Sequence, residues 1–91
     1  MGIDYTCFEP HVVYTNGGKP TKEVVVTIKN DCGGTVQVYV VEPSGDHLTD
    51  KEIGPPGGKV ALTVPKDHSV HVFCKDGDNH QNGCNVTVED A

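Results

Sequence analysis

The sequence contains no arginine and no tryptophan, and aromatic residues make up only 5% of it. Proteins that bind nucleic acid usually recognise phosphate with guanidinium groups on a basic face. This chain instead has thirteen acidic residues against seven lysines, which gives a net charge of −6. We therefore expect no nucleic-acid partner, and we interpret the acidity as a contribution to solubility.

Long apolar runs are also missing. None approaches the ~20 residues that a transmembrane helix needs, no signal peptide is recognisable, and no segment repeats apolar residues at the helical period. We expect no membrane insertion. Met1 and Gly2 look like a start placed before a trimmed mature chain, so a secreted or periplasmic protein would have lost its export signal here.

Motifs for hydrolytic catalysis are absent as well. The two serines, Ser44 and Ser69, do not lie in a Gly-x-Ser-x-Gly elbow. A chain of 91 residues reads as one domain with a thin core, and such a domain has little room for a cleft that excludes water. We therefore expect a single domain over residues 1–91, with no enzymatic activity and no cofactor.

The residues that are present favour β-structure, most clearly over residues 23–42. Val36, Val38 and Val40 alternate with Gln37 and Tyr39, which is the period-2 pattern of a half-buried strand. The sequence predicts a hairpin in the centre of the core, made of a strand over 24–29, a turn over 30–34 and a strand over 35–41.

Further short alternating segments follow at intervals of about 10–12 residues, which is typical of a β-sandwich or barrel. We predict an all-β fold, a small antiparallel β-sandwich of Greek-key or immunoglobulin-like type with six to seven short strands. The other strands are expected at 3–8 on an edge, at 11–15, at 47–53 as a loop or weak edge strand, at 59–64, at 69–74 and at 84–89.

Four cysteines in a short chain predict two disulfides and an oxidising compartment, because CxxC spacing typical of a zinc site is absent. Cys74 would end one strand of a hairpin and Cys84 would begin the next, which brings their Cα atoms within the ~4.4–6.8 Å that a disulfide requires. We predict Cys74–Cys84, which leaves Cys7 to pair with Cys32.

Two aromatic side chains are the strongest candidates for ligand contact. Tyr39 and Phe73 are expected on outward strand faces, with Gln37 and His71 as polar neighbours, and such a platform suits a glycan or a protein. Alternatively, both aromatic rings pack under the second sheet or under the loop around Leu48. We expect a monomeric recognition module that binds through a sheet face or through loops.

Metal binding has a weaker basis. Asp76, Asp78 and Asn79 could supply oxygen ligands for calcium from the loop over 76–82, but the run fails the EF-hand pattern, and a solvated turn has the same composition. His68 and His71 are three residues apart, so on a strand they face opposite sides. We expect no metal at the histidines.

The sequon Asn85-Val86-Thr87 satisfies the rule for N-glycosylation. It follows Cys84 at the expected start of a strand. Because Val86 should face inward, Asn85 should face outward, and its use as a glycosylation site depends on the host.

One family resemblance is visible. Residues 28–36, IKNDCGGTV, resemble the I-x-N-x-C-x-x-T-V pattern near the start of thaumatin-like proteins, which are secreted disulfide-rich β-sandwiches associated with antifungal defence. The chain is less than half the usual length of that family, has fewer cysteines, and carries Gln37 where an aromatic residue is usual. The resemblance implies an alternative function, a secreted defence-type protein (antimicrobial, inhibitor or hydrolase-like), and the competing pairing Cys32–Cys84 with Cys7–Cys74.

Overall fold

The computed structural model describes residues 3–5, 9–18, 20–75 and 84–91. These residues form eight β-strands and no helix, so the predicted all-β class is confirmed. The number of strands exceeds the six to seven predicted, because the segment at 47–53 is a genuine strand. The strands are β1 (Ile3–Tyr5), β2 (His11–Thr15), β3 (Thr21–Asn30), β4 (Thr35–Val41), β5 (His47–Ile53), β6 (Gly57–Pro65), β7 (Ser69–Lys75) and β8 (Cys84–Asp90).

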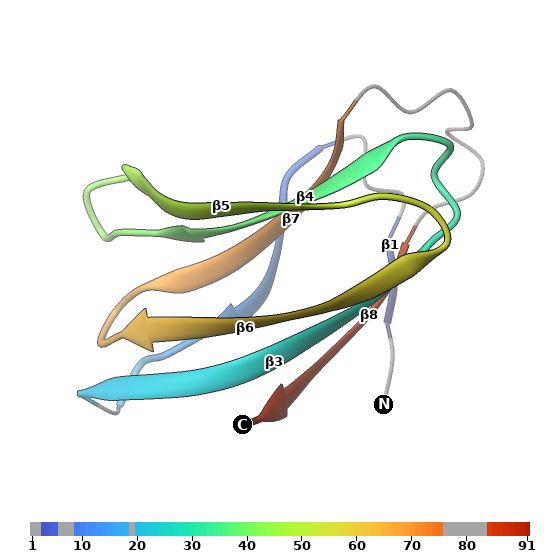
Figure 1. The fold of residues 1–91 in the computed structure, drawn as a ribbon. Helices are drawn as coiled ribbons and strands as arrows, with labels where there is room; N and C mark the ends of the chain where they lie inside the picture. Colours follow the sequence, from blue (N-terminus) through green and yellow to red (C-terminus); the bar gives the residue numbers. More distant parts are fainter. Residues whose placement is uncertain (1–2, 6–8, 19, 76–83) are drawn as a thin grey trace.

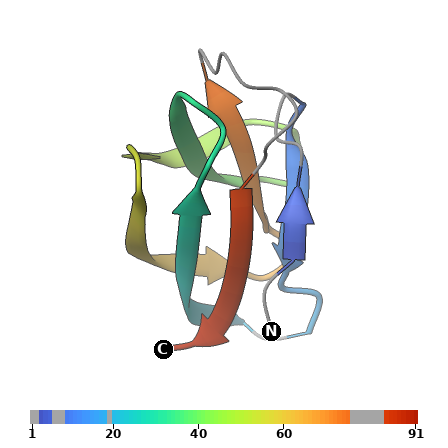
Figure 2. The ribbon, with the colours of Figure 1, turned by 90° about the vertical axis from the view of Figure 1, so that its right-hand side faces the viewer.

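The strands pack as two four-stranded antiparallel sheets, as predicted for a sandwich (Figure 1). Sheet A has the order β1-β8-β3-β6 and sheet B the order β2-β7-β4-β5. Figure 2 shows β1, β8 and β3 side by side at one end of sheet A. Among the described strands, only β4 and β5 are consecutive neighbours within one sheet, and every other connection crosses between the sheets.

This strand order is that of a jelly roll, in which two Greek keys are wound together. It differs from the immunoglobulin sandwich in one respect that affects the rest of the molecule. The last strand, β8, lies between β1 and β3 in sheet A. In the immunoglobulin sandwich the last strand instead lies at the edge of the opposite sheet.

The core lies between the sheets and consists mainly of valine. On β4 the period-2 pattern predicted its members correctly, because side chains two apart point to the same face. Stiff β-branched side chains suit this pleated surface. The buried apolar side chains, apart from the cysteines and Tyr39, are Val24, Val26, Ile28, Val36, Val38, Val40, Ile53, Leu62, Val64, Val70, Val72 and Val86.

The predicted hairpin between β3 and β4 is wrong, although both strands exist. β3 lies in sheet A and β4 in sheet B, so the turn residues carry the chain from one layer to the other. The Asn30 side chain holds this corner. Its Nδ2 donates to the carbonyl oxygens of Gly34 and Ile53, both at 2.9 Å, and its Oδ1 accepts from the Cys32 amide at 3.1 Å.

A second buried asparagine holds the opposite end of the sandwich. Asn16, after β2, is 2% exposed, and its Nδ2 donates to the Val64 carbonyl at 2.9 Å. Its own amide donates to the His68 carbonyl, and its carbonyl accepts from Asp67. The chain after β2 is thereby fixed to the turn between β6 and β7, and it crosses to sheet A instead of forming a hairpin.

The disulfide that the structure describes joins Cys32 to Cys74, with Cα atoms 6.3 Å apart. Both predicted bridges, Cys74–Cys84 and Cys7–Cys32, are therefore wrong, and so is the competing set with Cys32–Cys84 and Cys7–Cys74. The expected hairpin between Cys74 and Cys84 does not exist, because β7 and β8 lie in different sheets. Cys84 is also disulfide-bonded, and Cys7 lies outside the described residues.

The register of sheet B explains the observed bridge. Cys74 on β7 pairs with Val36 at the start of β4. The corner that precedes β4 therefore lies over the end of β7, and the buried Cys32 in that corner comes within bonding distance of Cys74.

We predict that the double variant Cys32→Ala/Cys74→Ala is less stable than the native chain by about 4 kcal/mol in the chain-entropy account of disulfides. The two cysteines are 42 residues apart, so the bond closes a long loop in the unfolded state. Urea unfolding of both proteins under non-reducing conditions measures the difference. A tryptic map should recover the Cys32 peptide linked to the Cys74 peptide, and a loss of stability below about 1 kcal/mol would contradict the prediction.

Candidate ligand-binding face

The outer face of sheet B brings the four predicted ligand-contact residues together. β4 and β7 are the central strands of this sheet, and Tyr39 pairs with His71 while Gln37 pairs with Phe73. Residues directly opposite in an antiparallel pair have Cβ atoms about 4.5–5.5 Å apart. The outward residues of β4 and of β7, each predicted from alternation alone, therefore form one continuous patch. We call this outer face of sheet B the sheet B face.

Tyr39 lies at the centre of this face but is only 3% exposed. Its ring stacks on the His47 imidazole, with centroids 4.4 Å apart and planes at 23°. The His71 imidazole lies on it at 5.6 Å and 35°. Tyr39 is thus buried, as the alternative prediction stated. The side chains that cover it are histidines of its own face, and not those of the second sheet. Tyr39 supports the face and is not its accessible ring.

Sequence reasoning missed His47. The signal that could have found it is the turn over 43–46, which joins β4 to β5 as a hairpin and pairs Val41 with His47. Alternation then places Tyr39, Val41 and His47 on one side, and the diagonal neighbours in such a pair are within reach of aromatic rings.

Two titratable groups of this cluster, His71 and Tyr39, have pKa values shifted toward the neutral form of the side chain. Burial lowers the pKa of His71, and the nearby charge of protonated His47 lowers it further. Burial raises the pKa of Tyr39, and the Asp50 carboxylate adds to that shift. The His71 Nε2 lies 3.0 Å from the Ser69 hydroxyl, so this hydrogen bond fixes the orientation of the imidazole.

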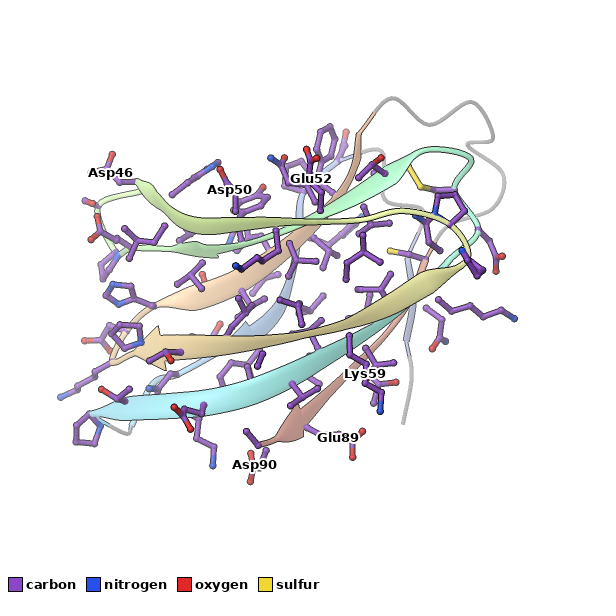
Figure 3. All side chains as sticks on the ribbon, viewed as in Figure 1. Asp46, Asp50, Glu52, Lys59, Glu89 and Asp90 are labelled. Carbon is purple, nitrogen blue, oxygen red and sulfur yellow. A yellow bond between two sulfur atoms is a disulfide. The ribbon has the colours of Figure 1, made fainter. Side chains whose placement is uncertain are left out.

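A second row of side chains crosses the face beside this cluster. Phe73 of β7 is opposite Gln37 of β4, which in turn is opposite Glu52 of β5. Phe73 and Gln37 are half-buried and Glu52 is exposed, so an aromatic ring, an amide and a carboxylate are presented in line. Figure 3 shows Asp50 and Glu52 projecting from β5 on the side away from sheet A.

One edge of the sheet B face is apolar and the other is acidic. Val12 on β2 is opposite His71 and is 53% exposed. Across the sheet, β5 and the turn before it carry the exposed carboxylates of Asp46, Asp50 and Glu52 (Figure 3). The face therefore offers apolar contact at β2 and β7 and hydrogen-bond acceptors at β5.

Within the described residues, no group of three or more His, Cys, Asp or Glu side chains is arranged to hold a metal ion. The His68 Nδ1 lies 2.8 Å from the Lys66 carbonyl oxygen, whereas His71 contacts Ser69, so these two histidines have separate partners. The candidate calcium loop with Asp76, Asp78 and Asn79 lies outside the described residues.

The glycosylation candidate Asn85 lies on β8, opposite Lys29 of β3 and Asp4 of β1. Val86 is buried, so Asn85 is on the outer face of sheet A, as the alternation predicts, and it is half-buried there. Glycosylation at Asn85 stays a prediction.

No helix that could cross a membrane occurs in the part of the chain that the structure describes. Comparison of the chain with protein-family models, with curated proteins and with solved structures found no match. The functional argument therefore depends on the geometry of the sheet B face, and the thaumatin-like resemblance stays a prediction.

We predict that the native chain loses stability as the pH falls below about 6.5, and that His71→Gln loses less. The folded-state pKa of His71 is lower than its ordinary value of 6.5, so the unfolded chain binds the proton more readily. Stability contributed by neutral His71 is then complete above pH 6.5 and declines as the pH falls toward the folded-state pKa. Glutamine keeps a hydrogen-bonding group near Ser69 but does not titrate.

Thermal unfolding between pH 7.5 and 5 measures this difference. His68→Gln, a histidine outside the stacked cluster, is the matched control and should follow the native chain. Equal pH dependence in His71→Gln and the native chain would contradict the prediction.

Proposed function

We propose that the protein is a secreted or periplasmic recognition module that binds a glycan, without catalysis, through the sheet B face. The observation that supports this most directly is the row Phe73, Gln37 and Glu52, in which a partly exposed aromatic ring is followed by an amide and a carboxylate. Sugar rings have an apolar face of C–H groups and a rim of hydroxyl groups, so they need this combination of stacking surface and hydrogen-bonding groups.

The dimensions of the row favour a short oligosaccharide. Neighbouring strands are about 4.8 Å apart, so the row across β7, β4 and β5 spans about 10 Å. This suits about two sugar rings laid across the strands. His71 and Val12 extend the apolar part of the surface toward β2, so a longer chain would continue in that direction.

The rigidity of the sheet supports binding without rearrangement. Gln37 and Phe73 are on the two central strands, and the inward neighbours Val36, Val38 and Val72 are fully buried. A site built on packed strands loses little conformational entropy when a ligand binds. An oxidising compartment, with which the Cys32–Cys74 disulfide is consistent, suits a module that meets glycans outside the cytosol.

The thaumatin-like resemblance suggests a defence-type protein as the alternative. Such a protein would need a concave acidic cleft with converging carboxylates to act on a polymer. The carboxylates on β5 instead lie along the margin of a sheet, and this arrangement favours recognition.

We predict that Phe73→Ala weakens glycan binding by up to about tenfold, because loss of one aromatic contact of up to about 1.5 kcal/mol corresponds to about a factor of ten. The measurement is an NMR titration of the native chain with cellohexaose, chitotetraose, a mannan oligosaccharide and a galactan oligosaccharide. Amide shifts should centre on β4 and β7. Thr27→Ala, on the outer face of sheet A, is the control and should bind as the native chain does.

A lack of shifts on β4 and β7 with every oligosaccharide would overturn the proposal. Shifts confined to loops or to sheet A would also overturn it, because the proposed stacking ring is on β7.

A further inference from the structure

The sandwich leaves four strands at sheet edges, and edge strands offer unpaired N–H and C=O groups to other chains. Three of these edges are protected. β1 has three described residues, β2 has a register shift between Val12 and Tyr14, and β5 has both a register shift and the charged run Asp50, Lys51 and Glu52. Short length, bulges and charges are the usual means of preventing edge pairing.

The fourth edge strand, β6, is the least protected: Lys59 and the terminal Pro65 are its only features of this kind. It is nine residues long, pairs with β3 without a register shift, and carries Lys59 as its one charged residue. Its exposed side chains near the middle, Ala61 and Thr63, are small. Figure 1 shows β6 at the margin of sheet A with β3 on one side only.

The hydrogen bonds at the ends of the β3–β6 ladder show which groups face this edge. The Asn30 amide donates to the Pro56 carbonyl, and the Lys66 amide donates to the Pro20 carbonyl, both at 3.0 Å. Hydrogen-bonded pairs alternate along an antiparallel ladder. Val60 and Leu62 therefore bond to β3, while the backbone groups of the odd-numbered residues point away from it.

The residues whose backbone groups point away from β3 are Lys59, Ala61 and Thr63, with Gly57 and Pro65 at the strand ends. We call them the outward-pointing set. Proline has no backbone N–H, so at a position whose backbone groups face β3 it would remove a hydrogen bond from the β3–β6 ladder. Pro65 is in the outward set, opposite Thr21, so its missing donor costs that ladder nothing.

We propose that β6 is a self-association edge, at which a second copy of this chain adds its own β6 in antiparallel orientation and joins the two A sheets. The edge is complementary to itself. With a two-fold axis at Ala61, each Ala61 faces its equivalent, and each Lys59 faces Thr63 of the second copy. The residues that would exchange hydrogen bonds across the axis all belong to the outward-pointing set, so the donors and acceptors match in register.

Side chains also match across this pairing. No like charges are directly opposite, because Lys59 meets a threonine. On the inner face, the half-buried Val60 meets the buried Leu62 of the second copy, which continues the apolar layer from one sandwich into the next. At the ends, the Gly57 amide meets the Pro65 carbonyl, which is the group that proline retains.

The interface is narrow, so the association is expected to be reversible. Stable complexes generally bury more than about 1,000 Å², and pairing through a single strand is at or below this limit. We therefore expect a reversible equilibrium in which dimer is populated only at high protein concentration. The sequence-based expectation of a monomer would then hold only in dilute solution.

The proposal is tested by sedimentation velocity between about 10 and 500 μM, with hydrogen exchange measured in the same samples. Dimer should appear with concentration, and the Lys59, Ala61 and Thr63 amides should exchange at least tenfold more slowly in the concentrated sample. The Val60 and Leu62 amides already bond to β3 and should be unchanged. A chain that stays monomeric at 500 μM would overturn the proposal.

Variants at the symmetry axis give an independent test. Ala61→Pro removes an outward N–H that β3 does not use, so the fold should persist while the dimer is lost. The control Ala61→Thr keeps the N–H and should still dimerise. Because each residue 61 faces its equivalent, Ala61→Lys and Ala61→Glu should each be monomeric and should pair when mixed.

This charge complementation keeps the test decisive if Ala61→Pro fails to fold. A dimer that survives in both charged variants would overturn the proposed register. Dimerisation that protects the amides of another edge strand, or protection of β6 only on addition of an unrelated extended peptide, would also overturn it.

Discussion

The corner at Asn30 is the constraint on which the rest of the structure depends. A buried amide that lacks hydrogen bonds costs several kcal/mol, so the Asn30 side chain is stable only where all its partners are present. Those partners are the Gly34 and Ile53 carbonyls and the Cys32 amide, which belong to the turn and to the end of β5. A β3–β4 hairpin would not bring Ile53 to this point. The side chain therefore favours the crossing between sheets over the local alternative.

The composition of the sheet B face follows from this crossing. Since β4 leaves β3 at the corner, its edges are available to β5 and β7, and the register with β7 sets Tyr39 beside His71 and Gln37 beside Phe73. The Cys32–Cys74 disulfide joins the same corner to the end of β7. Corner, disulfide and face are thus one connected arrangement, in which the stacked histidines bury Tyr39 and leave Phe73 as the partly exposed ring.

Local pattern predicted the strands well, and it predicted their partners poorly. Alternation is a property of neighbouring residues, so β2, β4 and the inward valines of β4 were found from the sequence. Pairing depends on residues far apart in the chain, and the turn composition Asn-Asp-Cys-Gly-Gly suits a hairpin and a crossing equally. The disulfide pairing failed for the same reason, because it was derived from an assumed hairpin. The burial of Tyr39 required His47, whose position depends on the β4–β5 register.

The placement of charge on the edges connects the fold to the two proposals. β5 and β6 are consecutive strands that form edges of opposite sheets, and they are equally open to pairing by topology. Only β5 carries a run of charged residues, and those residues border the proposed glycan row. A dimer through β6 leaves the outer faces of both B sheets exposed, although it brings the two β5 margins toward each other, because β5 and β6 lie at the same margin of the sandwich. Two weak sites on one dimer bind a repetitive polymer far more tightly than either does alone. Avidity of this kind offsets the low affinity expected of a small, flat site on a single sheet, and it gives a physical reason for one regular, nearly uncharged edge to persist in a sandwich whose other edges are protected.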